Sequence, residues 1–182
     1  MCIRDSGITE TTSNLVYKDE SGALNESFSD IFGVIIANWF PAQPNPITGW
    51  IWELGAGLGA GGLPFRDFSN PPRTGHPDHW SNRKYIGTNT DNGGVHYNSN
   101  IHNKAVFNLI TATDNTGNPI LTLSEVSIFY YMTLRRLNRM AKFSDCLRNL
   151  RAVAATYFAG NPQRSSQVLA EITQAYSSVG IR

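Results

Sequence analysis

The stretch ALNESFSDIFGVIIANW, residues 23–39, decides the fold that we expect for this chain. Its large apolar side chains recur at the spacing of one helical face, and Pro41, which cannot continue a helix, follows them. The pattern therefore predicts a helix of about four turns. The apolar face is formed by Leu24, Phe28, Ile31, Phe32, Ile35 and Trp39.

The opposite face of this helix carries Glu26, Asp30, Gly33 and Ala37. Two carboxylates share this stripe with two very small residues, which indicates that a second element packs closely there. A helix covered on both sides is central, and a carboxylate on it needs a cation, a hydrogen-bond donor or a metal. Taken alone, the E-x-x-x-D pair is more typical of a solvated or salt-bridged pair than of a metal site.

Helical periodicity continues through the second half of the chain. The sequence DNTGNP, residues 114–119, predicts a turn after the first of these helices. Ser124 is expected to cap the N-terminus of the next one. The predicted helices cover residues 101–112, 124–140, 143–158 and 165–179. The predicted fold class is therefore mainly α, a helical bundle with one long loop region.

The loop region, residues 41–85, is rich in Gly, Pro and Trp and is longer than an ordinary connection. Its glycine run GAGLGAGG, residues 55–62, follows no predicted strand and precedes no Lys-Ser/Thr pair, so we expect a flexible loop and no phosphate site. Two histidines, His76 and His79, flank Pro77, which argues against paired metal ligands on a helical face. We expect both histidines to form hydrogen bonds within the loop.

The composition of the 182 residues indicates one domain without a nucleic-acid or membrane partner. The net charge is +1 and the Lys and Arg residues are scattered, so neither partner is attracted by charge alone. Apolar runs fall far short of the roughly 20 residues that a membrane span needs. Cys2 and Cys146 do not support a disulfide framework. The first residues, MCIRDSGITE, contain no apolar segment typical of a signal peptide.

The stretch DNGGVHYNSNIHNKA, residues 91–105, is dense in glycine, histidine, amide and carboxylate groups. Such a run is poor core material, because every buried polar group needs a partner. His96 follows a Gly-Gly pair, where the chain can turn sharply or approach a ligand, and Asp91 is near enough to fix the tautomer of its ring. From these residues alone, a structural histidine remains the more frequent explanation.

Two stretches together resemble the downstream signatures of the thermolysin-like zinc metalloendopeptidases. They are ESGALNESFSDIFG, residues 20–33, and DNGGVHYNSNIHNKA, in the same order as in the family. The resemblance runs over residues 7–182, and the last stretch, residues 150–182, is similar to the family's C-terminal end. It implies the C-terminal helical-bundle domain of a secreted neutral endopeptidase, which hydrolyses internal peptide bonds by metal-activated water.

The resemblance assigns a metal-binding role to the first signature. Glu26 matches the third zinc ligand, which completes a two-His, one-Glu site and leaves a position for the attacking water. Asp30 matches the carboxylate that orients a zinc-bound histidine, and Asn25 matches a neighbouring amide that supports the same site.

The resemblance also assigns residues that contact the substrate. His96 matches the histidine that donates to the oxyanion of the tetrahedral intermediate, with Asp91 holding its ring, and Tyr17 matches the tyrosine that donates to the same oxygen. Arg66 resembles the arginine that binds a backbone carbonyl of the substrate on the primed side. Residues that would line an apolar primed-side pocket are Phe65, Leu54 and Leu58. Further along the second signature, we expect Asn98 and Ser99 to tie the loop to its surroundings, and Asn100 to tolerate a left-handed conformation where the family more often has glycine; His102 is expected to be structural.

The chain departs from the family before residue 7. The family's H-E-x-x-H helix supplies two zinc ligands and the general base, but Cys2, Ile3 and Ser6 stand at these positions. We therefore interpret residues 1–6 as a non-family start and expect this chain to be inactive without its parent's metal helix. The N-terminal, mostly β domain that forms the other wall of the cleft is an expected partner.

The paired calcium site of the family is also expected to be lost. Its acidic residues correspond to positions around Ala37, Ile51 and Ala56, and only Glu53 remains acidic. An alternative function is a non-catalytic protein that uses the cleft surface to bind peptides or a partner. A plain helical scaffold would explain none of the retained residues. Six retained site residues favour the peptidase, because a binding protein has little use for donors aimed at an oxyanion: Tyr17, Asn25, Glu26, Asp30, Asp91 and His96.

Overall fold

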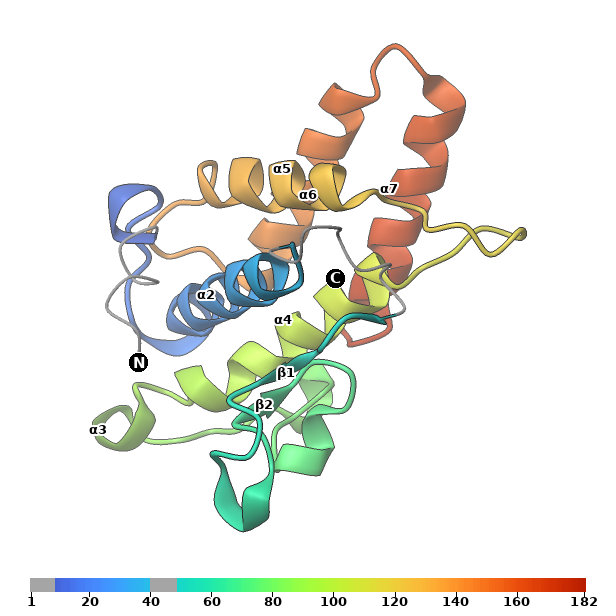
Figure 1. Ribbon diagram of the computed structural model, residues 1–182. Coiled ribbons are helices and arrows are strands. Elements are labelled where there is room, and N and C mark those ends of the chain that lie inside the picture. The colour runs from blue at the N-terminus through green and yellow to red at the C-terminus, as the bar shows by residue number, and fades with distance from the viewer. Residues whose placement is uncertain (1–8, 40–48) are drawn as a thin grey trace.

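Helices make up most of the computed structural model, which describes residues 9–39 and 49–182 (Figure 1). Pro41, at which we expected the first helix to end, lies outside the described residues. The longer helices are α2 (Asp19–Trp39), α4 (Val95–Ile110), α5 (Leu123–Leu134), α6 (Phe143–Tyr157) and α7 (Pro162–Ser177). The predicted mainly α fold is confirmed.

The described part of the loop region contains short elements that the sequence did not predict. Strands β1 (Glu53–Leu54) and β2 (Arg66–Asp67) pair antiparallel, with Glu53 opposite Asp67. A 3-10 turn, η2, connects the two strands, and two further 3-10 turns and the four-residue helix α3 follow them. They are η2 (Ala60–Gly62), η3 (Pro71–Thr74), η4 (Trp80–Asn82) and α3 (Thr88–Asp91). This region runs along one side of α2 and α4, with β1 against α2 and η3 against α4 (Figure 1).

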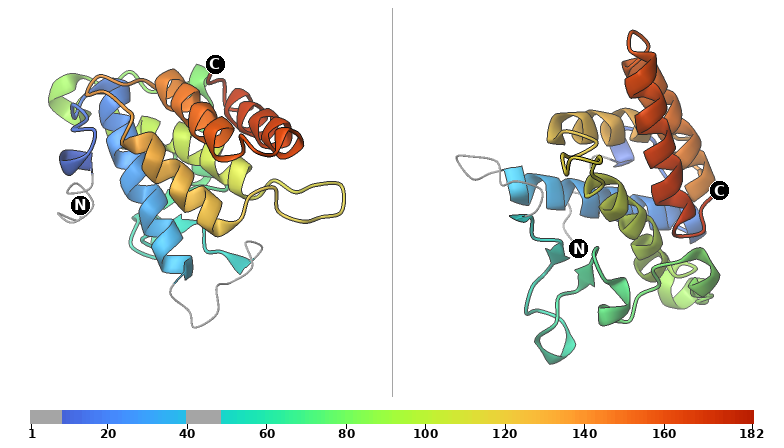
Figure 2. Two further views of the ribbon diagram at one scale, coloured as in Figure 1. Left: turned by 90° about the horizontal axis from the view of Figure 1, so that it is seen from above. Right: turned by 90° about the vertical axis from the view of Figure 1, so that its right-hand side faces the viewer.

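Helix α2 is central and packs along α4, as Figures 1 and 2 show. At Gly22 the two helices approach so closely that a Cβ atom would lie 2.5 Å from Val95 Cγ1. The predicted second packed face is present in part: a Cβ atom at Gly33 would contact Leu54 at 3.9 Å. Ala37, which we expected on the same packed face, is exposed.

Helix α4 begins earlier than predicted, at Val95 instead of Ile101. Gly93 and Gly94 have φ angles of 91° and 89°, so the whole turn is completed before the helix starts. Most of the polar stretch is thus helical and not a loop. Asn98 nevertheless ties α4 to the loop region through two hydrogen bonds with the Lys84 backbone, of 2.8 and 2.9 Å.

The expectation for Ser99 was wrong because the helix includes this stretch. Ser99 donates to the His96 carbonyl within the same helix, at 3.1 Å, and does not tie the stretch to another element. Asn100 is helical, not left-handed. Its side-chain amide donates to the carbonyls of His96 and Tyr97, at 3.1 and 3.2 Å.

Helix α5 is capped by Thr122, so the expected cap at Ser124 was wrong. The Thr122 hydroxyl accepts from Glu125 N, and the Glu125 carboxylate accepts from Thr122 N at 2.8 Å, which is a capping box. The helix ends at Leu134 and not at Met140. Beyond it, the Asn138 side chain bonds to Met140 N at 2.9 Å, a local bond that competes with helix formation.

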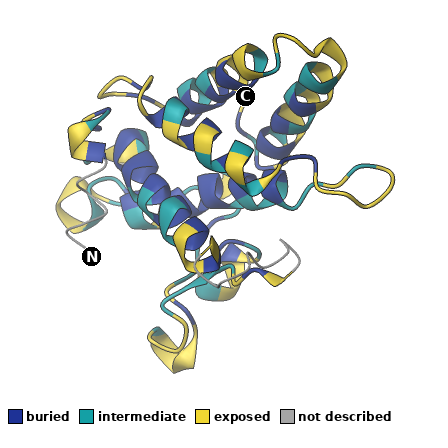
Figure 3. Ribbon diagram, turned by 45° about the horizontal axis from the view of Figure 1, so that its top comes forward, coloured by how far each residue is buried: buried dark blue, intermediate teal, exposed yellow. Residues whose placement is uncertain are grey.

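Helices α6 and α7 form an antiparallel pair that closes the core (Figure 2). Helix α7 begins at Pro162 instead of Ser165, because proline suits the first helical position and Asn161 caps it through Arg164 N. The buried faces of the helices meet in one apolar cluster (Figure 3). Among residues 9–39 and 49–182, no helix is both long enough and apolar enough to span a bilayer.

His102 lies in this cluster and is fully buried, in agreement with the expected structural role. Its ring stacks on that of Phe143, with centroids 5.8 Å apart and planes 11° apart. Burial lowers the pKa of His102 to about 3. The imidazole is therefore neutral in the folded protein at ordinary pH.

Acidification should destabilise the fold through His102. The unfolded chain protonates a histidine near pH 6.5, whereas the folded protein keeps His102 neutral down to pH about 3. Between pH about 3 and 6.5, the unfolded state thus binds more protons than the folded state. The contribution of His102 to the free energy of unfolding is constant above pH about 6.5 and falls below it, by up to about 1.4 kcal/mol per pH unit.

Denaturant unfolding of the unmodified protein and of His102→Gln, between neutral and mildly acidic pH, measures this effect. The variant should be less stable at neutral pH, because it loses ring packing, but its stability should fall less steeply as the pH drops. Equal slopes for the two proteins would contradict a neutral buried His102.

Candidate active site

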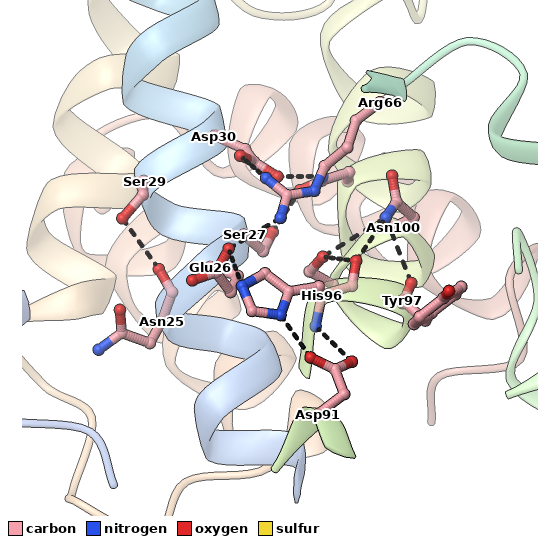
Figure 4. Close-up of polar contacts among 12 residues, drawn as sticks. Asn25, Glu26, Ser27, Ser29, Asp30, Arg66, Asp91, His96, Tyr97 and Asn100 are labelled. Atoms are coloured by element: carbon pink, nitrogen blue, oxygen red, sulfur yellow. Dashed lines mark hydrogen bonds and ion pairs between the residues drawn. The ribbon is translucent and has the colours of Figure 1, made fainter. Parts of the chain in front are cut away.

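A shallow pocket of about 310 Å³ lies where α2, the start of α4 and strand β2 meet. It is lined by Glu26 of α2, Phe65 and Arg66 at β2, His96 of α4 and His76 of the loop region. Figure 4 shows the Glu26, Arg66 and His96 side chains directed toward one another from these different elements. The structure thus brings together residues that are far apart in the sequence.

Arg66 bridges the two carboxylates of α2. Its guanidinium donates to Asp30 Oδ1 at 2.7 Å and to Glu26 Oε2 at 2.8 Å (Figure 4). The side chains of Asp30 and Glu26 are only 6% and 12% exposed, so each would be costly to bury without a cation. Both carboxylates of the predicted stripe are therefore paired with one arginine, which reaches from β2 to α2.

The pKa values of this pair reflect burial and opposite charge. Burial raises the pKa of Asp30 to about 6, against the opposing effects of Arg66 and of the Asn103 side chain. For Arg66, burial acts to lower the pKa, but the Asp30 and Glu26 carboxylates outweigh it and hold the pKa above its ordinary value. Asp30 is thus a carboxylate at neutral pH, with Arg66 as its counter-ion.

Tyr17 and His96 converge on the other side of Glu26. The Tyr17 hydroxyl donates to Glu26 Oε1 at 2.5 Å and lies 3.0 Å from His96 Nε2. Burial and the hydrogen bond to Glu26 raise the pKa of Tyr17, so the phenol keeps its proton. His96 Nε2 lies 3.6 Å from Glu26 Oε2.

Asp91 fixes the orientation of His96. One carboxylate oxygen bonds to His96 Nδ1, and the other accepts from His96 N at 3.2 Å (Figure 4). The turn at Gly93 and Gly94 makes this double contact possible, because it folds α3 back against the first turn of α4. His96 is thereby held with Nε2 directed toward Tyr17 and Glu26.

Of the other predicted site residues, only Phe65 lines the pocket. Asn25 is buried on α2, and its side chain points away from Glu26 and His96 in Figure 4. Of the three residues expected in the apolar pocket, Phe65 lines the pocket described above, whereas Leu54 packs against the core. Leu58 is 70% exposed, on the connection between β1 and β2.

His76 is a pocket residue that the sequence did not reveal. Its Nδ1 lies 2.8 Å from Thr74 Oγ1, so the expected hydrogen bond within the loop is present, as it is between His79 and Ser81. Burial, and secondarily Arg66, lowers the pKa of His76 to about 4. No spacing in the irregular loop region indicated that this neutral imidazole faces the pocket.

The described residues do not by themselves fit a zinc ion. Among residues 9–39 and 49–182, no three His, Cys, Asp or Glu side chains are grouped as metal ligands. Glu26 offers one carboxylate, and both of its oxygens are hydrogen-bonded, to Tyr17 and Arg66. Cys2, Ile3 and Ser6, at the positions of the family's metal helix, lie outside the described residues.

Comparisons with known proteins relate nearly the whole chain to one family. The family model described as thermolysin metallopeptidase, alpha-helical domain, matches residues 13–181. The chain is 37% identical over 180 residues to thermolysin of Alicyclobacillus acidocaldarius subsp. acidocaldarius. It is 35% identical over 175 residues to the extracellular elastase of Staphylococcus epidermidis.

These matches cover 96% of this chain but only about 30% of either relative, so the chain spans less than a third of their length. A solved structure, the precursor of protealysin, a metalloproteinase from Serratia proteamaculans, matches with a TM-score of 0.77 and 30% identity. That match covers 97% of this chain and 55% of the solved chain. Because sequence and fold agree over nearly the whole chain, it belongs to the thermolysin metallopeptidase family and corresponds to the alpha-helical domain of its members.

Proposed function

We propose that this chain is the C-terminal part of a secreted, zinc-dependent neutral endopeptidase and forms one wall of its substrate cleft. The observation that carries the proposal is the convergence of Tyr17, Glu26, Arg66 and His96 on one pocket. The domain that we infer covers residues 7–182, with residues 1–6 outside it. Its partners would be a peptide or protein substrate and the N-terminal β-rich domain of the parent enzyme.

The pocket residues have the chemistry needed to hold a peptide carbonyl as it becomes an oxyanion. Tyr17 and His96 present a phenol and an imidazole 3.0 Å apart. Both can donate to one oxygen beside them when the Tyr17 proton turns away from Glu26 and His96 carries a proton on Nε2 as well as on Nδ1. The raised pKa of Tyr17 keeps its donor proton in place. Donors of this kind stabilise developing negative charge with little movement, because Asp91 already orients the His96 ring and Tyr17 has only to turn its hydroxyl proton away from Glu26.

Arg66 can bind a second carbonyl of the substrate. Its contacts to Asp30 and Glu26 use two of the five N–H donors of a guanidinium, and the group lines the pocket. Phe65 beside it provides an apolar surface that is 55% exposed. This combination favours a peptide whose residue just after the scissile bond is bulky and apolar.

Zinc belongs to the parent enzyme in this proposal. Glu26 would be one of three protein ligands, and two histidines and a general base would come from the metal helix, for which residues 1–6 are no substitute. Zinc affinity requires several ligands on a rigid scaffold. We therefore infer that residues 1–182 alone do not hydrolyse peptides.

A non-catalytic peptide-binding protein is the alternative function. It is favoured by one observation, that Arg66 already satisfies both carboxylates of α2 without a metal. Such a protein would use the same pocket but would have no need for Tyr17 and His96 to meet at one point. An experiment that restores the H-E-x-x-H helix distinguishes the two proposed functions.

Fusion of residues 7–182 to an N-terminal β-rich domain ending in an H-E-x-x-H helix should give a chelator-sensitive peptidase. In this fused protein, His96→Ala should lower kcat/KM by about a hundredfold or more, because one donor to the oxyanion is lost. Tyr17→Phe should have an effect in the same direction. Cleavage of an internally quenched peptide measures each rate.

Tyr85→Phe is the matched control, since Tyr85 is 82% exposed and lies outside the pocket, and it should leave the rate unchanged. The unfused chain with added zinc should show no cleavage. Chelator-sensitive cleavage by the unfused chain would refute its inactivity. A fused protein that binds peptides without cutting them would support the alternative function.

We also propose that the paired calcium site has been replaced by an ion pair. Glu53, the acidic residue that remains, lies 2.6 Å from Arg73, and the same guanidinium lies 2.8 Å from Asp67 Oδ2. Ile51 and Ala56 offer no side-chain oxygen. One arginine is thus paired with both carboxylates and leaves only one net negative charge, which weakens the attraction for a divalent cation.

The melting temperature should therefore be the same in calcium and in a calcium chelator, because the Arg73 contacts to Glu53 and Asp67 do not depend on the ion. Differential scanning calorimetry in each condition, with magnesium as the control for ionic strength, measures this. A large rise in melting temperature with calcium alone would show that a calcium site persists.

A further inference from the structure

A row of buried hydrogen bonds connects the core with the candidate active site. His102 Nδ1 lies 2.7 Å from Ser27 Oγ, and Ser27 Oγ donates to Asn103 Oδ1 at 2.6 Å. The Asn103 side-chain amide then donates to Asp30 Oδ2 at 2.8 Å. Ser27, His102 and Asn103 are each fully buried, so bulk water cannot replace any of these hydrogen bonds.

The donors and acceptors of these hydrogen bonds can be assigned in only one way, and Asp30 determines the assignment. The Asp30 carboxylate only accepts hydrogen bonds, so Asn103 must turn its NH₂ group toward Asp30 and its oxygen toward Ser27. The Asn103 oxygen also only accepts, so the Ser27 hydroxyl donates its single proton to it. Ser27 Oγ is left as an acceptor for the ring of His102.

This assignment determines the tautomer of His102. Its Nδ1 must carry the proton, because an unprotonated Nδ1 would face the lone pairs of Ser27 Oγ at 2.7 Å. Its Nε2 is then an acceptor and takes the proton of the Tyr176 hydroxyl, 2.8 Å away, with Cys146 Sγ also within 3.3 Å. Every donor from Tyr176 to Asn103 thus points toward the Asp30 carboxylate.

Asp30 receives donors from two opposite directions. Asn103 binds Oδ2 from the core side, and Arg66 binds Oδ1 from the pocket side at 2.7 Å. Fixing Oδ2 leaves Oδ1 as the oxygen presented to a cation or donor in the site. A buried donor row also polarises its last member, which strengthens the bond to the carboxylate.

We propose that His102 and Ser27 are positioning residues that act through Asn103 to hold Asp30, with Oδ1 presented to the active site. The relevance to catalysis rests on the proposed function, in which Asp30 orients a metal-bound histidine. The row itself is a property of this chain and can be tested without metal or substrate. If Ser27 loses its hydroxyl, the Asn103 oxygen loses its donor, and the amide that holds Asp30 is free to rotate.

The test is the tautomer of His102, measured on the full chain by NMR correlation of the ring nitrogens and protons. The unmodified protein should have its proton on Nδ1. Ser27→Ala should move it to Nε2, because Nδ1–H would have no acceptor whereas Nε2–H can donate to Tyr176. Tyr176→Phe should leave it on Nδ1, since Ser27 still accepts.

A second readout on the same samples reports on the site. Exchange of the Asn103 side-chain amide protons with solvent should become at least about fivefold faster in Ser27→Ala, the change expected for loss of one ordinary hydrogen bond. The Arg66 guanidinium signals should shift with it. Ser29→Ala is the matched control on the same helix, because the Ser29 hydroxyl bonds only to the Asn25 carbonyl, at 3.1 Å. It should change neither readout.

A proton on Nε2 in the unmodified protein would overturn the proposal, as would a Ser27→Ala variant with unchanged Asn103 exchange and Arg66 signals. The same conclusion would follow if Tyr176→Phe moved the proton and Ser27→Ala did not. These outcomes are independent of hydrolysis by the fused protein. A row that behaves as expected beside an inactive fusion would refute the proposed function and leave the positioning role intact.

Discussion

The ion pair between Arg66 and the two carboxylates of α2 is the interaction on which the site depends. Helix α2 is covered on both sides, so Glu26 and Asp30 could be buried only with a cation or several donors beside them. Arginine suits this task better than lysine, because its planar fork can bind two carboxylates at once. The pair also fixes the position of β2, whose two residues make too few backbone contacts to hold it on their own.

The glycines around α2 and α4 set the geometry in which this ion pair becomes part of a site. Close approach at Gly22 brings the N-terminal part of α2 against the start of α4, so that His96 comes within 3.6 Å of Glu26. The turn at Gly93 and Gly94 brings Asp91 against the His96 ring. Further along α4, the buried row that ends at Asn103 holds Asp30. Helix packing, and not any one loop, thus places the chemical groups.

Most helices could be predicted from the sequence, because apolar residues at helical spacing mark the faces that form the core. The residues at which the helices begin and end were harder to predict. The signal for the start of α5 was present as T-x-x-E from Thr122 to Glu125, whereas the start of α4 was hidden because a glycine pair is typical of a loop. Contacts made through the irregular region could not be predicted at all: the ion pair of Arg66 and the pocket position of His76 depend on tertiary structure. The same is true of Ser27 and His102, which meet across 75 residues of sequence.

A double-mutant cycle of Arg66→Met and Asp30→Asn tests most directly whether this ion pair organises the site. Arg66→Met should lose about 3 kcal/mol or more in the free energy of unfolding, because the buried carboxylates are left without their cation. Asp30→Asn should lose less, because Arg66 keeps its ion pair with Glu26. The double variant should lose less than the sum, with a coupling energy of about 2 kcal/mol. Additive losses, within about 0.5 kcal/mol, would show that the two residues act independently and would contradict the account.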